Sequence, residues 1–489
     1  MRRDRLALVA LVGLVVLSGC TVPGSPDQFD TDREFGYVGD YAHDDEFAFD
    51  DNEALTEAQL EAVTYRAMAR IEVIRELKFE RDVELEVITR SEYRDQRADP
   101  GEGSAFTNEL WRGAFVVDGE TDVERAMDDL YGDAVQGYYS NDRIVVITDD
   151  TEDIRIDRGT LVHELVHALQ DQQFGLDRRG ETIDERRAEL GLIEGEANYV
   201  PYLYDQRCGD EWQCVADYDP EPEAAGDREI NLGLFLSIYA PYAGGPSFVA
   251  DLRDRGGWAT VDGAYDDRPV STSQVIHPER YPDDRPVDVA VPDRSSDEWE
   301  SVTDDGEVRT ETVGEATLFA SLWVNGVVER SLTEGGTELS PYNYSHPATD
   351  GWAGDTFRVY QDGDRTGHVW TLAWASDDDA ERFAEAYRTL LENRGATAVD
   401  APGEAYRIPD DDGFAGAYRV TVDGETVTIV GAPSVDDLEE IHGTASLEAE
   451  AAIGSTTPTA SSAGASSPVG STPAALAQSS TPPASAADG

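Results

Sequence analysis

Apolar residues recur every three to five positions along several stretches of the chain, which places them on one face of an α-helix. In the first of these stretches, residues 52–79, the polar residues Asp51 and Asn52 stand where a helix cap is expected. The same spacing predicts further helices over residues 157–174, 183–205, 230–255, 313–330 and 378–393. Helices should therefore dominate the part of the chain that precedes residue 300.

Apolar and polar residues alternate in shorter stretches, as they do in half-buried strands. Residues 83–88 and 143–148 show this pattern in the first half of the chain. Two hairpins follow, with strands over residues 356–361 and 368–375, and over 418–422 and 426–430. The predicted fold class is α+β, with a mainly helical domain over residues 51–300 and a smaller C-terminal domain of hairpins and helices over residues 301–450.

The beginning of the chain has the pattern of an export signal. Arg2 and Arg3 precede an apolar run over residues 6–17, which is too short to span a bilayer comfortably. The sequence Leu-Ser-Gly-Cys that ends at Cys20 resembles a lipobox, so residues 1–20 are expected to be a lipoprotein signal peptide. A simple cleaved signal and a cytosolic protein with an apolar start are the alternatives, and the export route stays open.

Two segments of biased composition flank the predicted domains. Residues 21–50 are rich in Asp, Gly, Pro and Ser and predict an acidic tether. Residues 451–489 are rich in Ala, Ser, Thr and Pro and predict a disordered tail. A lipid on Cys20 would then hold the protein at the outer face of the cell membrane, so the membrane is an expected partner.

The charge of the chain is strongly acidic, with 38 Lys+Arg against 101 Asp+Glu and a formal net charge of −63. This balance excludes an ordinary nucleic-acid-binding protein, because affinity for phosphates comes from clustered cations. A hydrophobic content of 40% also excludes a wholly disordered acidic chain. The acidity is spread along the sequence and lysine is nearly absent, which is typical of a surface adapted to concentrated salt and indicates a haloarchaeal source.

Besides Cys20, the chain contains only Cys208 and Cys214. In an exported protein, two cysteines so close in sequence predict a local disulfide. The alternative is a pair of free thiols. The spacing lacks the further ligands that a zinc knuckle needs.

The residues that carry chemistry lie in the helix predicted over 157–174. His163 and His167 are four positions apart, so both imidazoles lie on one helix face and can share a metal ion. Glu164 lies beside them, where its carboxylate can reach a water activated by that metal. Two imidazoles with a carboxylate favour zinc as the cofactor. The alternative is a pair of core histidines without a metal.

A catalytic zinc ion needs a third protein ligand. Glu194 and Glu196, on the next predicted helix, are the candidates. Glu194 is favoured because Asn198 follows it on the same face, where the amide could bond a ligand histidine as an outer partner. Two ordinary surface glutamates are the alternative.

A donor that stabilises the negative charge of the transition state is also expected near the metal. His277, followed by Tyr281, is the preferred catalytic candidate because it stands in an irregular segment that could fold over a cleft. Tyr344 with His346 is the second pair, and a histidine that merely fixes a loop is the alternative. The strand over residues 143–148 could form the edge of that cleft and pair with an extended peptide, or it could be an ordinary sheet strand.

The motif His163-Glu-x-x-His167, followed by Glu194 on a second helix, resembles the gluzincin type of zinc metallopeptidase. The resemblance implies His163, His167 and Glu194 as zinc ligands and Glu164 as general base, in a zincin-like domain. The chain is also similar to a family of uncharacterised secreted bacterial and haloarchaeal proteins. This wider likeness spans roughly residues 54–433 and rests on residues 74–79, 163–173, 193–197, 273–279 and 351–355.

These patterns together predict a lipid-anchored, zinc-dependent metallopeptidase of the cell surface. Its substrate would be a peptide or protein, hydrolysed by a zinc-activated water with Glu164 as general base. The alternative is a non-enzymatic envelope protein with a structural or vestigial zinc site. Cleavage specificity and oligomeric state are not visible in the sequence.

Overall fold

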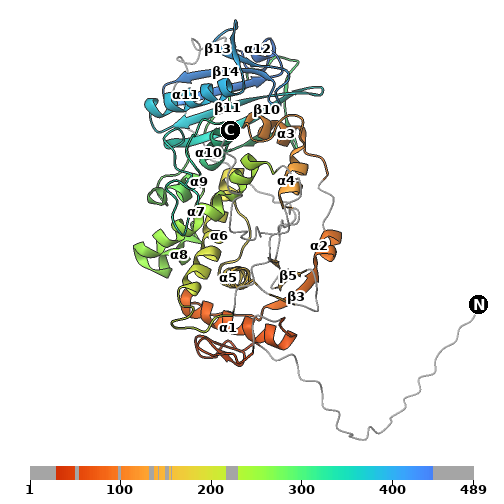
Figure 1. Cartoon of the computed structure of the whole chain (residues 1–489). Helices are drawn as coiled ribbons and strands as arrows, with labels where there is room; N and C mark the ends of the chain where they lie inside the picture. Colours follow the sequence, from red (N-terminus) through yellow and green to blue (C-terminus); the bar gives the residue numbers. More distant parts are fainter. Residues whose placement is uncertain are drawn as a thin grey trace, which may run out of the picture.

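The computed structural model describes residues 29–49, 54–96, 101–131, 137–140, 143–148, 154–155, 157–215 and 230–443. The predicted signal peptide, Cys20 and the tail over 451–489 lie outside these residues. The fold is α+β, in agreement with the patterning. Figure 1 shows α1 at one end of the molecule and the sheet of the C-terminal segment at the other, with α6 and α7 between them.

The helices are distributed along the whole described chain. They are α1 Glu57–Arg75, α2 Arg90–Gln96, α3 Ala105–Gly113, α4 Val123–Tyr131, α5 Arg158–Phe174, α6 Ile183–Asp205, α7 Leu232–Gly256, α8 Trp258–Ala264, α9 Thr272–Ile276, α10 Glu315–Val324, α11 Asp377–Asn393 and α12 Asp437–Ile441, with a 3-10 turn at Pro278–Arg280. Those predicted over 157–174, 183–205, 230–255 and 378–393 are therefore confirmed almost to the residue.

The strands fall into small sheets and one large sheet. They are β1 Tyr37–Val38, β2 Tyr41–Ala42, β3 Glu84–Thr89, β4 Gly137–Ser140, β5 Arg143–Thr148, β6 Glu300–Ser301, β7 Thr303–Asp304, β8 Glu307–Val308, β9 Thr310–Glu311, β10 Trp352–Asp362, β11 Arg365–Trp374, β12 Thr397–Val399, β13 Glu404–Ile408, β14 Gly416–Asp423 and β15 Thr426–Ala432.

Helix ends follow from their capping residues. Asp157 accepts from the backbone N–H of Thr160 and so begins α5, and Thr182 begins α6 in the same way through a capping box with Glu185. Helix α1 is shorter than the predicted range of 52–79. Thr56 caps it rather than Asp51 or Asn52, which lie outside the described residues.

Helices α6 and α7 approach each other closely through glycine. A Cβ atom on Gly195 would lie 2.5 Å from the backbone carbonyl carbon of Gly245, so neither position has room for a side chain. This contact fixes α6 against α7 at the level of residue 195. It therefore holds in place the stretch of α6 that contains the predicted third ligand.

A three-stranded sheet lies next to α5. Strand β5 occupies its centre, parallel to β3 on one side and antiparallel to β4 on the other. Of the two possibilities for residues 143–148, the structure supports the ordinary sheet strand and excludes the exposed edge, because both sides of β5 are hydrogen bonded. Within the described residues, β4 is the outermost strand on that side of the sheet.

The large sheet of the C-terminal segment has the strand order β12-β13-β14-β15-β11-β10-β6, with β9 also paired to β10. Both predicted hairpins are present, as β10–β11 and β14–β15. Gly363 and Gly424 in their turns have φ angles of 58° and 57°, which L-residues with side chains rarely adopt. Helices α3 and α11 pack on this sheet together with α10, so residues before position 300 contribute to its core.

Residues 29–49 are packed against α1, although their composition predicted a tether over 21–50. The buried carboxylate of Glu72 pairs with Arg33 and accepts from the backbone N–H groups of Gly36 and Phe79. Arg70 of α1 donates to the main-chain oxygen of His43 at 2.7 Å. Buried charges on α1 thus hold a segment that its own composition does not identify as structured.

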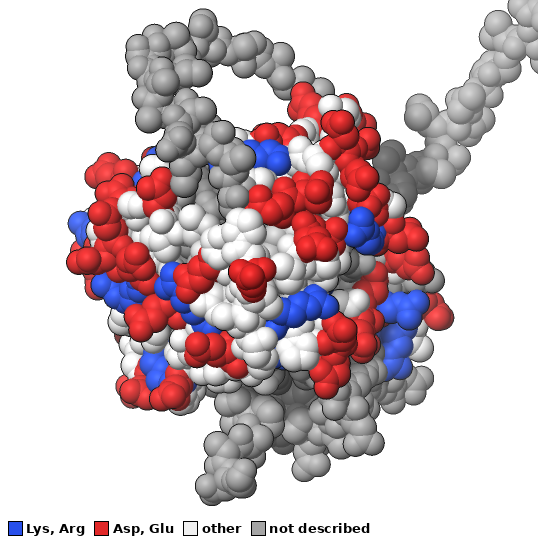
Figure 2. Space-filling view, turned by 90° about the horizontal axis from the view of Figure 1, so that it is seen from above, with Lys and Arg blue, Asp and Glu red and all other residues white. Residues whose placement is uncertain are grey.

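Three further features concern the surface and the covalent structure. Cys208 and Cys214 form a disulfide with a Cα–Cα distance of 5.4 Å, just beyond the end of α6. Figure 2 shows Asp and Glu side chains scattered over the face seen there rather than gathered in one patch. Among the described residues, no helix combines the length and apolar character needed to cross a bilayer.

Candidate metal centre

Helix α5 presents two histidines one turn apart. Nε2 of His163 lies 3.1 Å from Nε2 of His167, so the two imidazoles converge on one point. The helix that carries them is buried along most of its length, with Leu165 and Val166 fully inaccessible. The two ring positions are therefore determined by the packed interior and not by a mobile surface.

Glu194 on α6 completes the group. Its Oε2 atom lies 3.3 Å from Nε2 of His163 and 3.3 Å from Nε2 of His167. These separations exceed those of a charge-assisted hydrogen bond, which are about 2.7–2.9 Å. The buried Glu194 oxygens have no hydrogen-bond partner among the described residues.

The three converging atoms fit a zinc ion. Zinc binds imidazole nitrogen and carboxylate oxygen at about 2.0–2.2 Å, so tetrahedral ligand atoms stand roughly 3.3–3.5 Å apart. The observed edges of 3.1, 3.3 and 3.3 Å are close to those of such a tetrahedral face. Among the described residues, His163, His167 and Glu194 form the group whose ligand atoms are arranged to hold a metal ion.

The charges of the group are strongly coupled. Burial alone would raise the pKa of Glu194, but His167 and His163 hold that pKa well below its usual range. Burial alone would lower the pKa of His167, but the Glu194 carboxylate raises it to about 9. Zinc binds imidazole and carboxylate groups in their deprotonated forms, so metal binding should compete with protons at this group.

Glu164 lies beside the ligand group without joining it. Burial raises the pKa of its carboxyl group, while His163, His167 and a hydrogen bond from the backbone of Tyr139 lower it, and the net shift is upward. Its Oε2 atom has no partner in the described part of the chain. The residue therefore offers a buried carboxylate, tied to strand β4, with one oxygen available for a proton.

Gln170 is a neighbour of the metal group that the sequence analysis did not single out. Its Oε1 atom lies 2.8 Å from Nδ1 of His167, and its Nε2 atom donates to the main-chain oxygen of Ile193 and to the hydroxyl of Tyr265. Asn198, expected beside a ligand histidine, donates to the main-chain oxygen of Glu194 at 2.7 Å. The sequence did contain a signal for the contact between Gln170 and His167, because Gln170 stands three residues after His167 on the same helix.

Glu196, the rival candidate for third ligand, is engaged elsewhere. Its Oε1 atom pairs with Nε of Arg75, and its Oε2 atom accepts from the hydroxyl of Tyr265. The structure brings Glu194, and not Glu196, to the two histidines.

The predicted donors for the transition state also have other partners. Nε2 of His277 lies 2.9 Å from Oε1 of Glu315, which is buried, and its Nδ1 lies 4.0 Å from Glu279. These contacts favour the alternative in which His277 fixes a loop, because both ring nitrogens face carboxylates outside the metal group. The other candidates are engaged as well. The hydroxyl of Tyr281 donates to the main-chain oxygen of Asp267, and the hydroxyl of Tyr344 donates to the main-chain oxygen of Leu236. The backbone N–H of Ala348 donates to Nδ1 of His346.

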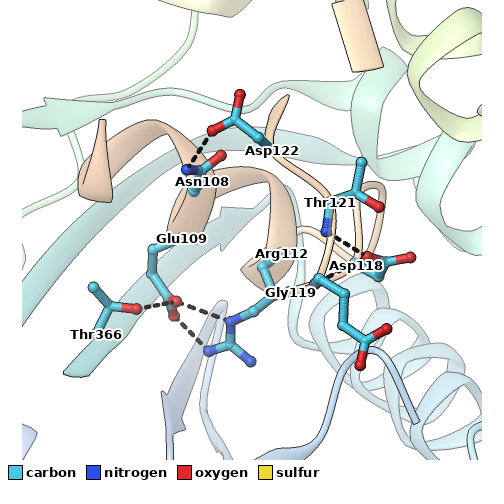
Figure 3. A pocket seen from close by; sticks show the side chains of 9 residues that line it. Asn108, Glu109, Arg112, Asp118, Gly119, Thr121, Asp122 and Thr366 are labelled. Atoms are coloured by element: carbon cyan, nitrogen blue, oxygen red, sulfur yellow. Dashed lines mark hydrogen bonds and ion pairs between the residues drawn. The ribbon is translucent and has the colours of Figure 1, made fainter. Parts of the chain in front are cut away.

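A separate hollow of about 300 Å³ lies between α3, the loop that follows it and β11 (Figure 3). There the buried Glu109 pairs with Arg112 and accepts from Thr366 and His368. Burial would raise the pKa of Glu109, but Arg112 and His368 lower it to about 2. Thr366 and His368 belong to β11, so their hydrogen bonds to Glu109 join α3 to the large sheet.

Comparison with known proteins identifies only the C-terminal segment. Residues 300–442 match the family described as "Domain of unknown function (DUF8575)". This match covers the large sheet with α10, α11 and α12, and the metal group lies outside it. No curated protein and no solved structure matches the chain.

Proposed function

We propose that this chain is a zinc-dependent metallopeptidase with a zincin-like domain, in which His163, His167 and Glu194 would hold the ion. The observation that carries the proposal is the convergence of these three ligand atoms beside the buried carboxylate of Glu164. A zinc ion in such a place supplies a Lewis acid that activates water and polarises a carbonyl group. Peptide-bond hydrolysis uses both effects.

Glu164 would act as the general base and then the general acid. Its carboxylate takes a proton from the attacking water and passes that proton to the leaving amine. An upward-shifted pKa suits both roles, because it brings the carboxyl group closer to neutral pH.

The composition of the ligand group also favours catalysis over a purely structural site. Structural zinc sites are generally closed by four protein ligands, whereas catalytic sites keep one position open. The group contains three ligand residues within the described chain. A non-enzymatic envelope protein would have no use for a buried Glu164 with a free oxygen.

The proposed location is the outer face of the cell membrane. It rests on the signal-like start of the chain and Cys20, and the acidic composition suits an exported protein in concentrated salt. The substrate would then be a peptide or an exported protein.

Hydrolysis of a mixed library of quenched fluorescent peptides by the full chain in concentrated salt tests the proposal. We expect cleavage that a zinc chelator abolishes and added zinc restores. A zinc-loaded, folded protein that cleaves no peptide of the library would contradict the proposed activity.

A further inference from the structure

We infer that Gln170 is a positioning residue that fixes the ring tautomer of His167, and that Tyr265, Glu196 and Arg75 hold Gln170 in the required orientation. The inference rests on the metal-binding part of the proposed function. It concerns zinc affinity and does not depend on peptide hydrolysis.

The orientation of the Gln170 amide follows from its partners. The main-chain oxygen of Ile193, 2.9 Å away, can only accept, so the atom that faces it must be the amide nitrogen. The same nitrogen donates to the hydroxyl of Tyr265 at 2.8 Å. Both amide hydrogens are thereby used, and Oε1 is left to face His167.

The orientation of Gln170 in turn determines which nitrogen of His167 carries hydrogen. Oε1 of Gln170 can only accept, so Nδ1 of His167, 2.8 Å away, must donate. A neutral imidazole has one N–H group, and Nε2 therefore presents its lone pair. That nitrogen is the one directed toward His163 and Glu194.

The hydrogen bonds at the Arg75 end of the network also have only one possible donor and acceptor. The Arg75 guanidinium is always a donor, and its Nε pairs with Oε1 of Glu196. Because Tyr265 receives a hydrogen from Gln170, it gives its own to Oε2 of Glu196. Each bond between Arg75 and His167 thus has one allowed direction.

All four residues of this network are buried and come from separate parts of the chain. Arg75 belongs to α1, Gln170 to α5 and Glu196 to α6, while Tyr265 follows α8. The Tyr265 ring stacks on Phe174 with centroids 4.1 Å apart. At these buried positions a misdirected amide would leave unpaired polar groups, so the tautomer of the neutral ring is set by folding.

The experiment compares two glutamines of the same helix. Gln170→Met removes the three hydrogen bonds of Gln170. Gln172→Met is the control, because buried Gln172 also makes three hydrogen bonds, to the backbones of Glu80 and Arg81, and none to the metal group. Zinc dissociation constants of the full chain would be measured in concentrated salt by competition with a chelating dye.

Loss of an outer partner of a metal ligand weakens metal affinity by about 10–100-fold, and we expect a change of that size for Gln170→Met. Gln172→Met should keep the wild-type zinc affinity within about twofold, although both variants lose stability. Equal zinc affinities of the two variants would overturn the inference.

A second pair of variants decides the question if Gln170→Met fails to fold. Tyr265→Phe keeps the ring on Phe174 but removes the hydroxyl, and Tyr204→Phe removes a buried hydroxyl that accepts from Arg70. We expect weaker zinc binding for Tyr265→Phe alone, by several-fold. If it binds zinc as tightly as Tyr204→Phe, the inference is wrong.

The two proposals fail in different ways. A wild-type chain that binds zinc but cleaves no peptide contradicts the proposed activity and leaves the role of Gln170 intact. Zinc affinities that do not distinguish the variants from their controls contradict the role of Gln170 alone. A wild-type chain without zinc affinity contradicts both.

Discussion

Oε2 of Glu194 lies 3.3 Å from Nε2 of His167, although the two residues belong to different helices. The same oxygen lies 3.3 Å from Nε2 of His163. A buried carboxylate without a hydrogen-bond partner is costly unless a proton or a cation neutralises it. The packing of α5 against α6 therefore maintains a site whose charge balance favours a cation.

Glu164→Gln tests the proposed general base. The amide is nearly the same size but cannot accept a proton, so we expect zinc to be retained and peptide hydrolysis to fall by about 100- to 10,000-fold. Turnover and bound zinc would be measured on the same preparation. Glu84→Gln, which alters an exposed carboxylate on β3, is the control and should keep full activity. Unchanged turnover in Glu164→Gln would rule out this residue as the base.

Glu194→Gln and Glu196→Gln separate the ligand from its neighbour. The first variant should weaken zinc binding beyond about 100-fold, because it alters a direct ligand and not an outer partner. The second should lower the free energy of unfolding by about 3 kcal/mol, because buried Arg75 loses part of its ion pairing. Zinc titration and denaturant unfolding would measure both effects. A larger loss of zinc affinity in Glu196→Gln than in Glu194→Gln would reverse the assignment.

Asp184, near the start of α6, should make stability depend on pH. Burial, with a further contribution from Asp355, raises its pKa from 3.8 to about 7. The folded state thus retains a proton that the unfolded state loses between these values. The free energy of unfolding should therefore fall as the pH rises from about 4 to 7. Above that range the full loss of stability from the buried, ionised Asp184 is present.

Asp184→Asn should remove this dependence. The stability of the variant relative to wild type should rise between pH 4 and pH 8 by up to about 4 kcal/mol, as measured by denaturant unfolding in concentrated salt. Asp254→Asn, at an exposed position on α7, is the control. A pH-independent difference between Asp184→Asn and wild type would show that Asp184 is already ionised in the folded protein.

Salt should stabilise the folded chain. With a formal net charge of −63, repulsion among carboxylates opposes folding, and salt reduces the screening length from about 10 Å at 0.1 M to about 3 Å at 1 M. We expect the thermal midpoint to rise by at least about 10 °C between 0.1 M and 2 M KCl. Circular dichroism melting curves measure this directly. A midpoint that stays constant would contradict salt adaptation of the surface.

Local sequence signals were sufficient for the helices that carry the site. Regular apolar spacing placed α5 and α6, and the spacing of His163 and His167 gave the shared helix face. The choice of Glu194 also agrees with the geometry. These features depend on residues within one or two helices, so the sequence alone contains them.

The remaining features depend on contacts between distant segments. Gln170 acquires its role from Tyr265 and Ile193, which the sequence does not connect to it. Strand β4 exists through pairing with β5 and is too short to show a pattern. Residues 29–49 are held in place by buried charged side chains of α1. His277 contacts Glu315, which lies 38 positions further along the chain.

The metal content of the purified full chain tests the central claim most directly. After equilibration with zinc and removal of the excess, elemental analysis should find about one zinc ion per chain. The double variant His163→Ala/His167→Ala should hold none while keeping the helical circular dichroism of the wild type. A wild-type chain without zinc, or a double variant that holds as much zinc as the wild type, would contradict the account.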